Sequence, residues 1–305
     1  MHAVPRHAVV RRAALRRAPL TPAGLSYAVL SEPKIGSSKA EYEDAWFVSA
    51  ERTGSRASAT RGCTVAIADG ASESMLAGAW ADRLTRAVGG LAGRELGADV
   101  FAERICAAAA RWPAHVDRYL RRRERIGRPI AWYEESKLEQ GAYATLLGVS
   151  FRWNPESESQ LAHSADGGLR GTWSAAALGD ACGFHVRDAR LAEAFPLERS
   201  ADFDTSPPLA GTRAPDRELI EARTVARHGT WLPGDVFYLA TDAAAQWFLA
   251  EAEDGREPWR EIDEVCDTGT PGDARAWLDK LRTECVMRND DVTIVRCRLD
   301  ANAAH

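Results

Sequence analysis

The 305-residue sequence has little of what a polyanion-binding, membrane-spanning or disulfide-stapled protein needs. Its 39 Lys and Arg residues are outnumbered by 44 Asp and Glu residues, so its net charge of −5 gives no overall reason to expect nucleic acid as a partner. No apolar run approaches the roughly 20 residues that cross a bilayer. The six Cys residues include no C-x-x-C pair, which argues against a thiolate zinc site or disulfides. We therefore expect a soluble, cytoplasmic protein with reduced thiols and neither a membrane nor a nucleic-acid partner.

Acidic residues are absent before Glu32, and five Arg residues lie in this first stretch. An Arg-rich, acid-free start is compatible with an organelle-targeting segment, although it contains little Ser and no secretory apolar region. We predict a disordered or extended N-terminus over residues 1–24, a single domain over residues 25–300 and a short tail over residues 301–305.

The hydrophobic pattern predicts strands in groups, separated by helices. Short runs rich in Val, Ile and aromatic residues predict strands at Leu25–Leu30, Ala45–Ala50, Cys63–Ala68, Tyr143–Trp153, Asp235–Ala240 and Asp291–Leu299, and a strand pair within Thr172–Val186. Helical spacing predicts helices at Ser74–Val88, Asp99–Arg125 (kinked or broken at Pro113), Ala244–Ala252 and Gly272–Met287. Ser200–Asp216 has the composition of an irregular insertion. Because strands and helices do not alternate one for one, the pattern favours an α+β fold with antiparallel sheets.

Acidic residues stand at the ends of several predicted strands. Asp69 and Asp242 each follow a buried apolar run, Asp290 and Asp291 open the last strand, and Glu43-Asp44 opens an early one. Each acid alone is explained by the frequency of Asp in turns. If they converge, their charges repel unless divalent cations lie between them, and oxygen ligands select Mg²⁺ or Mn²⁺. Gly70 lacks a Cβ, so its backbone can approach such an ion closely.

Five short motifs occur in a fixed order along the chain: Lys39-Ala-Glu-Tyr-Glu-Asp-Ala-Trp, Ala66-Ile-Ala-Asp-Gly, Ala177-Leu-Gly-Asp, Leu239-Ala-Thr-Asp and Asn289-Asp-Asp-Val-Thr. Together they resemble the ordered motifs of the metal-dependent protein phosphatases (the PPM, or type 2C, serine/threonine phosphatases), and most closely those of divergent bacterial members. The resemblance extends from about Leu25 to Leu299. It implies a four-layer αββα sandwich, in which two antiparallel β-sheets are flanked by helices.

The resemblance also implies a centre of two Mn²⁺ or Mg²⁺ ions. In it, Asp69 bridges both ions, Gly70 offers its carbonyl to one of them, and Asp242 and Asp290 complete the shell of the other. Glu43 and Asp44 hold metal-bound waters, and Asp180 lies where the family has an acid near a third, weaker metal position. Lys39 occupies the place of a phosphate-binding Arg. These residues are our candidate site.

The implied reaction is hydrolysis of phosphoserine or phosphothreonine monoesters by water that the ion pair activates, without a covalent phosphoenzyme. The implied partners are a phosphorylated protein substrate and a cognate serine/threonine kinase. Three positions depart from the pattern: Lys39 replaces Arg, Ala71 replaces a His suggested as general acid in animal members, and Ala243 replaces Gly. The first two leave open a second hypothesis, a phosphatase-like regulatory or binding module without turnover.

Three further features have ordinary structural interpretations. The basic cluster that includes Arg118, Arg121 and Arg128 is typical of a solvated helix end, with a docking patch for a phosphorylated or acidic partner as the alternative. The ten Trp residues are expected in core packing. His163, His185 and His228 do not have metal-ligand spacing.

Overall fold

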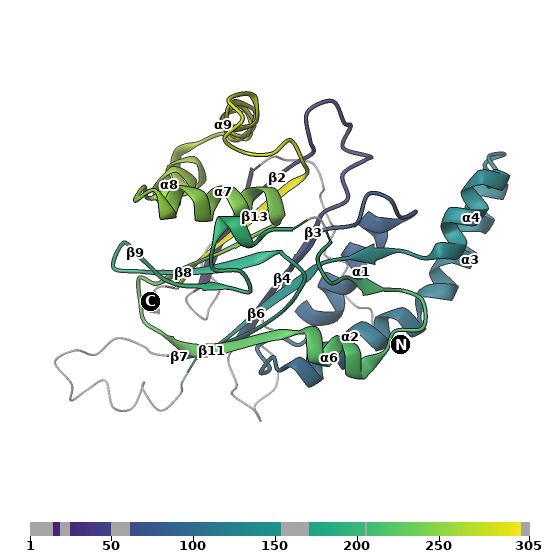
Figure 1. The fold of residues 1–305 in the computed structure, drawn as a ribbon, viewed down its shortest axis with the longest axis horizontal. Coiled ribbons are helices and arrows are strands. Elements are labelled where there is room, and N and C mark those ends of the chain that lie inside the picture. The colour runs from purple at the N-terminus through teal and green to yellow at the C-terminus, as the bar shows by residue number, and fades with distance from the viewer. Residues whose placement is uncertain (1–14, 19–24, 50–61, 154–170, 205, 300–305) are drawn as a thin grey trace.

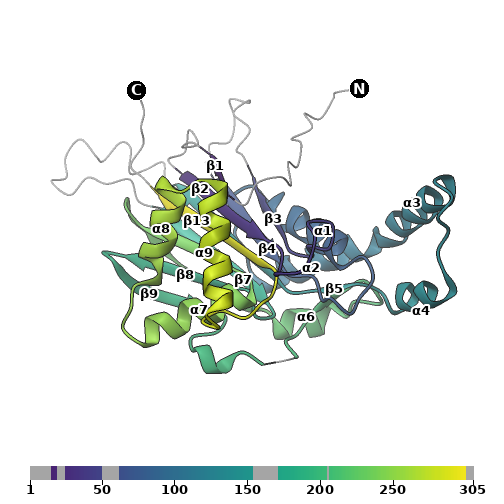
Figure 2. The same ribbon diagram turned by 90° about the horizontal axis from the view of Figure 1, so that it is seen from above.

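The computed structural model describes residues 15–18, 25–49, 62–153, 171–204 and 206–299. Two antiparallel sheets are stacked face to face in this part of the chain, with helices on both outer faces (Figures 1 and 2). The predicted α+β, four-layer αββα sandwich is therefore confirmed. Leu15–Ala18 forms an extended strand inside the N-terminal segment, and the rest of residues 1–24 and the tail 301–305 lie outside the described residues.

The first sheet has six strands in the order β1-β2-β13-β12-β8-β9. Their bounds are Leu15–Ala18 (β1), Leu25–Glu32 (β2), Cys182–Arg187 (β8), Arg190–Phe195 (β9), Val236–Ala240 (β12) and Val292–Leu299 (β13). The strand nearest the C-terminus, β13, pairs with β2 on one side and β12 on the other. Distant parts of the chain thus meet in the middle of this sheet.

The second sheet has five strands in the order β11-β7-β6-β4-β3. Their bounds are Ala45–Val48 (β3), Gly62–Ala68 (β4), Leu146–Trp153 (β6), Gly171–Leu178 (β7) and Val225–Trp231 (β11). Every residue of β4 is buried, because one face contacts the other sheet and the opposite face lies under helices. A short ladder joins β5 (Tyr143–Ala144) to β10 (Ala210–Gly211).

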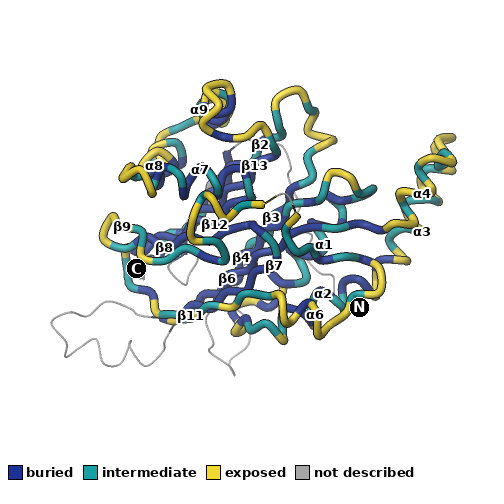
Figure 3. Tube along the Cα trace, viewed as in Figure 1, coloured by how far each residue is buried: buried dark blue, intermediate teal, exposed yellow. Residues whose placement is uncertain are grey.

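Three apolar cores hold the layers together, and the burial colours of Figure 3 show them as dark segments inside the sandwich. The core between the sheets includes Phe151, Phe237 and Trp231. The core outside the first sheet lies under α7 (Asp242–Glu253), α8 (Pro258–Thr268) and α9 (Pro271–Thr283). The core outside the second sheet lies under α1 (Ala77–Gly89) and α2 (Ala98–Ala110).

The remaining described elements are α3 (Trp112–Arg125), α4 (Trp132–Gln140), α6 (Arg217–Arg223) and the 3₁₀ turn η2 (Ser200–Asp202). The predicted helix over Asp99–Arg125 is divided at Arg111, with Pro113 in the first turn of α3, as the fixed φ and missing N–H of proline require. The strand pair predicted within Thr172–Val186 also forms, but β7 and β8 belong to different sheets. Among the described helices, none is long and apolar enough to cross a bilayer.

Candidate metal centre

The strand registers bring the candidate acids to one end of the sandwich. Ala45 pairs with Ala68, so Asp44 and Asp69, the next residue on each strand, lie side by side. In the other sheet Ala240 pairs with both Ile294 and Cys182, which places the segments holding Asp242, Asp290 and Asp180 at the same end. Antiparallel pairing explains this arrangement, since the end of one strand lies beside the start of its neighbour.

Asp44 is the buried centre of the cluster. Its Oδ2 accepts hydrogen bonds of 2.9 Å from both Thr241 Oγ1, which directly follows β12, and Thr293 Oγ1 in the neighbouring β13. Its Oδ1 is buried and meets no donor among the described residues. The carboxylate of Asp69 lies beside that of Asp44, and the Asp44 charge raises the pKa of Asp69. A buried carboxylate oxygen without a donor costs free energy, which a cation at this point would recover.

Burial and mutual repulsion raise the pKa values of these acids. The pKa of Asp69 is well above its ordinary value, because of burial first and then the charges of Asp44 and Asp242. The pKa of Asp44 is likewise raised by burial and by the charge of Asp291. Burial and the charge of Asp242 raise the pKa of Asp180 to about 7. The strand registers and the Thr241–Asp44 hydrogen bond bring acids of both sheets to one end, where their charges act on one another.

Glu43 and Gly70 lie on the α1 side of the cluster. The pKa of the Glu43 carboxyl is raised, chiefly by burial and then by the charge of Asp291, while a hydrogen bond with Ser72 opposes the shift. A Cβ on Gly70 would lie 2.8 Å from the carbonyl carbon of Ala77 and 2.9 Å from the Glu43 carbonyl oxygen. No side chain fits there, so glycine is required by close backbone packing between the Asp69 turn and the start of α1.

Asp290 and Asp291 have different environments. Asp291 is buried and accepts hydrogen bonds from the backbone N–H groups of Lys34 (3.0 Å) and Glu43 (2.8 Å), so it ties two loops together. The side chain of Asp290 is 43% exposed, and its carboxylate lies 3.7 Å from Lys34 Nζ. The buried Arg282 donates 2.7 Å to the Asp290 carbonyl and fixes this loop. Asp290 is therefore the accessible acid of the pair.

Arg288 is a cation of the site that the sequence interpretation missed. Its Nη2 lies 2.6 Å from Asp242 Oδ2. Burial raises the pKa of Asp242, the Arg288 charge opposes that shift, and the charge of Asp290 adds to it. No Lys or Arg lies beside Asp242 in the sequence, and the fold supplies this cation from 46 residues away. The signal available in the sequence was the position of Arg288 two residues before an acid of the cluster.

Tyr42 and the two threonines also escaped the sequence interpretation. The Tyr42 hydroxyl is hydrogen-bonded to Thr293 Oγ1 and donates 3.2 Å to the Val292 carbonyl, next to Asp44. Thr241 and Thr293 each stand within three residues of a candidate acid, and this adjacency was the available signal. Their hydroxyls hold the Asp44 carboxylate in one orientation.

The donor set suits a hard divalent cation. In the described part of the chain, no three His, Cys, Asp or Glu side chains already stand at metal-ligand spacing. Two of the acids, Asp242 and Asp290, instead pair with Arg288 and Lys34. The acids nevertheless offer oxygen ligands only. One of these oxygens, Asp44 Oδ1, is buried and has no donor among the described residues, and the closely packed backbone of Gly70 lies next to Asp69. These are the donors that Mg²⁺ and Mn²⁺ prefer.

Lys39 has a different setting from the acids. It lies exposed in the turn that the Ser38–Glu41 hydrogen bonds close, and no contact of its ammonium group with the acids is recorded in the described structure. Its role in phosphate binding stays a prediction. Among the described residues, Lys34 and Arg288 form ion pairs with carboxylates of the candidate set.

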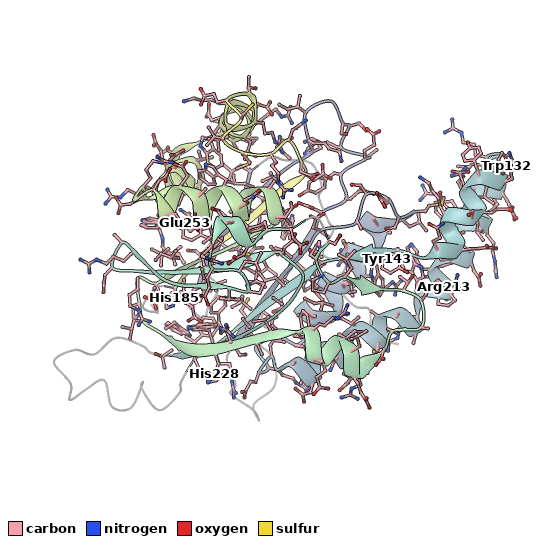
Figure 4. All side chains as sticks on the ribbon, viewed as in Figure 1. Trp132, Tyr143, His185, Arg213, His228 and Glu253 are labelled. Carbon is pink, nitrogen blue, oxygen red and sulfur yellow. The ribbon has the colours of Figure 1, made fainter. Side chains whose placement is uncertain are left out.

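The other residues singled out in the sequence have structural roles or lie outside the described residues. His185 is buried and hydrogen-bonded to Asp235, His228 is exposed, and His163 lies outside the described residues (Figure 4). Trp231, Trp247 and Trp259 are buried and Trp277 packs half-buried against the same core as Trp247 and Trp259, which confirms the packing role expected of these four. Trp132 is the exception, because it stands largely exposed on α4. Among the described residues, which include all six Cys, no disulfide is found.

Comparisons with known proteins support the fold. The sequence matches no protein-family model and no curated protein. In structure, a bacterial serine phosphatase aligns over 91% of this chain and 99% of its own, with a TM-score of 0.51 and 11% identity. The Mycobacterium tuberculosis serine/threonine phosphatase PstP/Ppp aligns over 90% of this chain and 99% of its own, with a TM-score of 0.49 and 15% identity. The first similarity confirms, at the level of the fold, the resemblance to phosphatases found in the sequence.

Proposed function

We propose that this chain is a divergent bacterial-type member of the metal-dependent protein phosphatases and hydrolyses phosphoserine or phosphothreonine monoesters in proteins. One observation carries the proposal. Within a phosphatase fold, buried acids from both sheets converge at one end of the sandwich around a carboxylate oxygen of Asp44 that has no donor. Such an arrangement is costly for stability and is typical of a site built for cations.

Two Mn²⁺ or Mg²⁺ ions would be held by Asp69, Asp242, Asp290, Glu43 and the Gly70 carbonyl, with Asp180 available to a third. When bound, such ions supply Lewis-acid activation of water and neutralise charge on the phosphoryl group. Asp44 would support the ions from behind these ligands. Thr241 and Thr293 occupy one of its carboxylate oxygens by hydrogen bonds, and the other oxygen remains available to the site. Its orientation is fixed before any ligand binds.

The chain's own cations would bind the phosphate. Arg288 pairs with Asp242, and Lys34 pairs with Asp290. The side chains of Arg288 and Lys34 are 49% and 32% exposed, so both are accessible to a substrate. Loading the acids with cations would weaken these two ion pairs and release both side chains toward an anionic ligand. Arg288 offers the bidentate fork that Lys39 lacks, so it compensates for the replacement of Arg at position 39.

The test is turnover of a phosphothreonine peptide and of p-nitrophenyl phosphate, with Mn²⁺ and with EDTA. We expect activity only with the metal, and a loss of at least about a hundredfold in Asp69→Asn. Asp188→Asn is the matched control, because Asp188 is exposed and its φ of 51° suits Asn. Activity that persists in EDTA, or an Asp69→Asn variant as active as the control, would reject the proposal.

The alternative is a phosphatase-like regulatory or binding module without turnover. The ion pairs Arg288–Asp242 and Lys34–Asp290 favour it, because they neutralise two acids without any metal. Elemental analysis and calorimetric titration with Mn²⁺ separate the two functions. A chain that takes up no Mn²⁺ and turns over no phosphopeptide is the module, whereas uptake of two ions with turnover is the enzyme.

The phosphatase proposal carries two further expectations. Its substrate would be a phosphorylated protein, and a serine/threonine kinase would act as its counterpart. We place both in the cytoplasm, where thiols stay reduced, since no disulfide is found among the described residues.

A further inference from the structure

Helices α3 and α4 form an arm that stands out from the sandwich. We define the arm as residues 112–140, and both ribbon views show it projecting away from the sheets (Figures 1 and 2). Only Trp112 of α3 is buried, and no residue of α4 is. An element that buries so little apolar surface adds little to the stability of the fold, so its composition needs another explanation.

One face of α3 carries a row of unpaired cations, which we call the Arg stripe: Arg118, Arg121, Arg122 and Arg125. Their spacing of three, four and seven residues places them on one side of the helix. All four are exposed, and no ion pair to any of them is found in the described part of the chain. Arg123 points elsewhere and pairs with Glu134 at 3.0 Å, which fastens α3 to α4. The four Arg residues of the stripe are therefore available to a partner, whereas Arg123 holds α3 against α4.

The positive charge continues from the stripe to the body of the protein. Arg83 on α1 lies with its guanidinium 6.0 Å from the Trp112 ring and 3.4 Å from His115 Nδ1. Burial lowers the pKa of Arg83, and the charges of Arg118 and Arg111 lower it further. Its Nε is buried without a hydrogen-bond partner. Cations packed this closely repel one another, and an anionic partner would relieve the repulsion.

The far end of the arm exposes large apolar side chains. Trp132 is 82% exposed, Tyr133 61% and Ile126 58%, and Figure 4 shows Trp132 at the tip. The Trp132 and Tyr133 rings stand edge to face with their centroids 5.9 Å apart. Exposed aromatic residues beside Arg are the residue types that dominate binding energy in protein interfaces.

The base of the arm leads directly to the candidate metal centre. Three residues after α4 ends, the Tyr143 carbonyl accepts a 2.9 Å hydrogen bond from the N–H of Ala71, two residues beyond Asp69. The 14 residues of α3 extend the arm by about 20 Å. A polypeptide bound at the centre would therefore reach the stripe with about six or more extended residues.

We propose that the arm is a docking surface for an acidic segment of the phosphoprotein substrate, which binds the Arg stripe through its carboxylates and the tip through an apolar residue. This inference rests on the proposed function, because it assigns the substrate class of the same site. The charge on the arm is matched to such a partner, because the chain as a whole has a net charge of −5 whereas this face of α3 carries four exposed Arg residues.

An anionic membrane fits the arm less well. Glu135 and Glu139 are exposed on the same side of α4 as Trp132, three and seven residues further along, and a flat negative surface that met Trp132 along α4 would also meet these carboxylates. A peptide can follow α3 alone and avoid them. The geometry therefore favours a protein segment over a lipid surface.

The experiment compares phosphothreonine peptides with and without a run of six Glu or Asp residues placed six to ten residues from the phosphothreonine. For the wild-type chain we expect the acidic run to lower KM about tenfold without changing kcat, and 0.5 M NaCl to remove the advantage. Arg121→Glu/Arg125→Glu should abolish the advantage, and Arg121→Lys/Arg125→Lys should retain it. Arg190→Glu/Lys280→Glu makes the same change in charge on exposed residues of the first-sheet side and should leave it intact.

Turnover of p-nitrophenyl phosphate separates this inference from the proposed function, since that substrate cannot reach the arm. Equal KM values for the two peptides, with p-nitrophenyl phosphate hydrolysed, would overturn the docking surface alone. If no substrate is turned over, anisotropy of a labelled, unphosphorylated acidic peptide still tests the arm. Wild-type binding that is lost in Arg121→Glu/Arg125→Glu and in Trp132→Ala supports it, and absence of binding overturns it. Arg-dependent sedimentation with phosphatidylserine vesicles but no peptide binding would also overturn it, in favour of a membrane.

Discussion

Replacing Asp180 by Asn tests the charge repulsion inferred for the acidic cluster. Asp180 is buried between β7 and β8, and burial with the charge of Asp242 raises its pKa from 3.8 to about 7. Between these two values the folded chain keeps a proton that the unfolded chain has released. The stabilisation is therefore fully present below pH 3.8, and it is lost as the pH rises through 7.

The magnitude follows from this interval. A shift of about three units, at about 1.4 kcal/mol each, corresponds to about 4 kcal/mol in total. The unfolded carboxyl is already largely ionised at pH 5, whereas the folded one ionises only near pH 7. The stabilisation lost between pH 5 and pH 8 therefore corresponds to about two pH units, or about 3 kcal/mol. Because Asn carries no charge, the free energy of unfolding of Asp180→Asn relative to the wild-type chain should rise by about 3 kcal/mol from pH 5 to pH 8.

The assay is urea unfolding in EDTA at pH 5, 6.5 and 8, which gives the free energy of unfolding of both chains under metal-free conditions. Asp188→Asn, an exposed change of the same kind, should keep a constant difference from the wild type. Parallel pH profiles for Asp180→Asn and the wild type would refute the reasoning, because they would mean that the Asp180 carboxyl titrates alike in the folded and unfolded chains.

Two other substitutions test the packing of the site and the far end of the sandwich. Gly70→Ala should lower the free energy of unfolding by about 1–3 kcal/mol and impair Mn²⁺-dependent turnover, because its Cβ would press on the backbone of Ala77 and Glu43. Gly272→Ala, whose Cβ would meet nothing closer than 3.6 Å, is the control, and equal stability of the two variants would contradict the close packing. Asp235→Asn should cost about 2 kcal/mol at pH 7. Burial favours the neutral acid, but hydrogen bonds from Arg187 and His185 outweigh it and lower the pKa of Asp235 to about 2. This contribution is lost as the pH falls from 3.8 to 2. Urea unfolding should therefore show a smaller difference in the free energy of unfolding between the wild type and Asp235→Asn at pH 2.5 than at pH 7. An equal difference at the two pH values would contradict the stabilising role of these hydrogen bonds.

The elements that the sequence predicted well are those whose burial imposes a simple pattern. β4 and β12 are buried at every position, so each appears as an unbroken apolar run. α1 buries Trp80, Leu84 and Val88 on one face, which gives it helical spacing. The acids at strand ends were visible because each interrupts or follows such a run.

Other elements lack that pattern for physical reasons. β11 is an edge strand that alternates between half-buried and exposed residues, and α4 has no buried residue, so neither shows a periodic apolar face. Strand order is also absent from local periodicity, since nothing in the residues of β13 says that it lies between β2 and β12. The Arg288–Asp242 ion pair joins residues 46 positions apart, and only the folded chain brings them together.

The position of β13 in the middle of the first sheet has a consequence for synthesis of the protein. While β13 is still inside the ribosome, the emerged chain can form the hairpins of the second sheet. At this stage β2 and β12 lack the strand that lies between them in the first sheet. Asp44 then lacks Thr293, and Asp242 lacks Arg288. The acidic cluster is therefore completed only after β13 has been synthesised and has paired with β2 and β12.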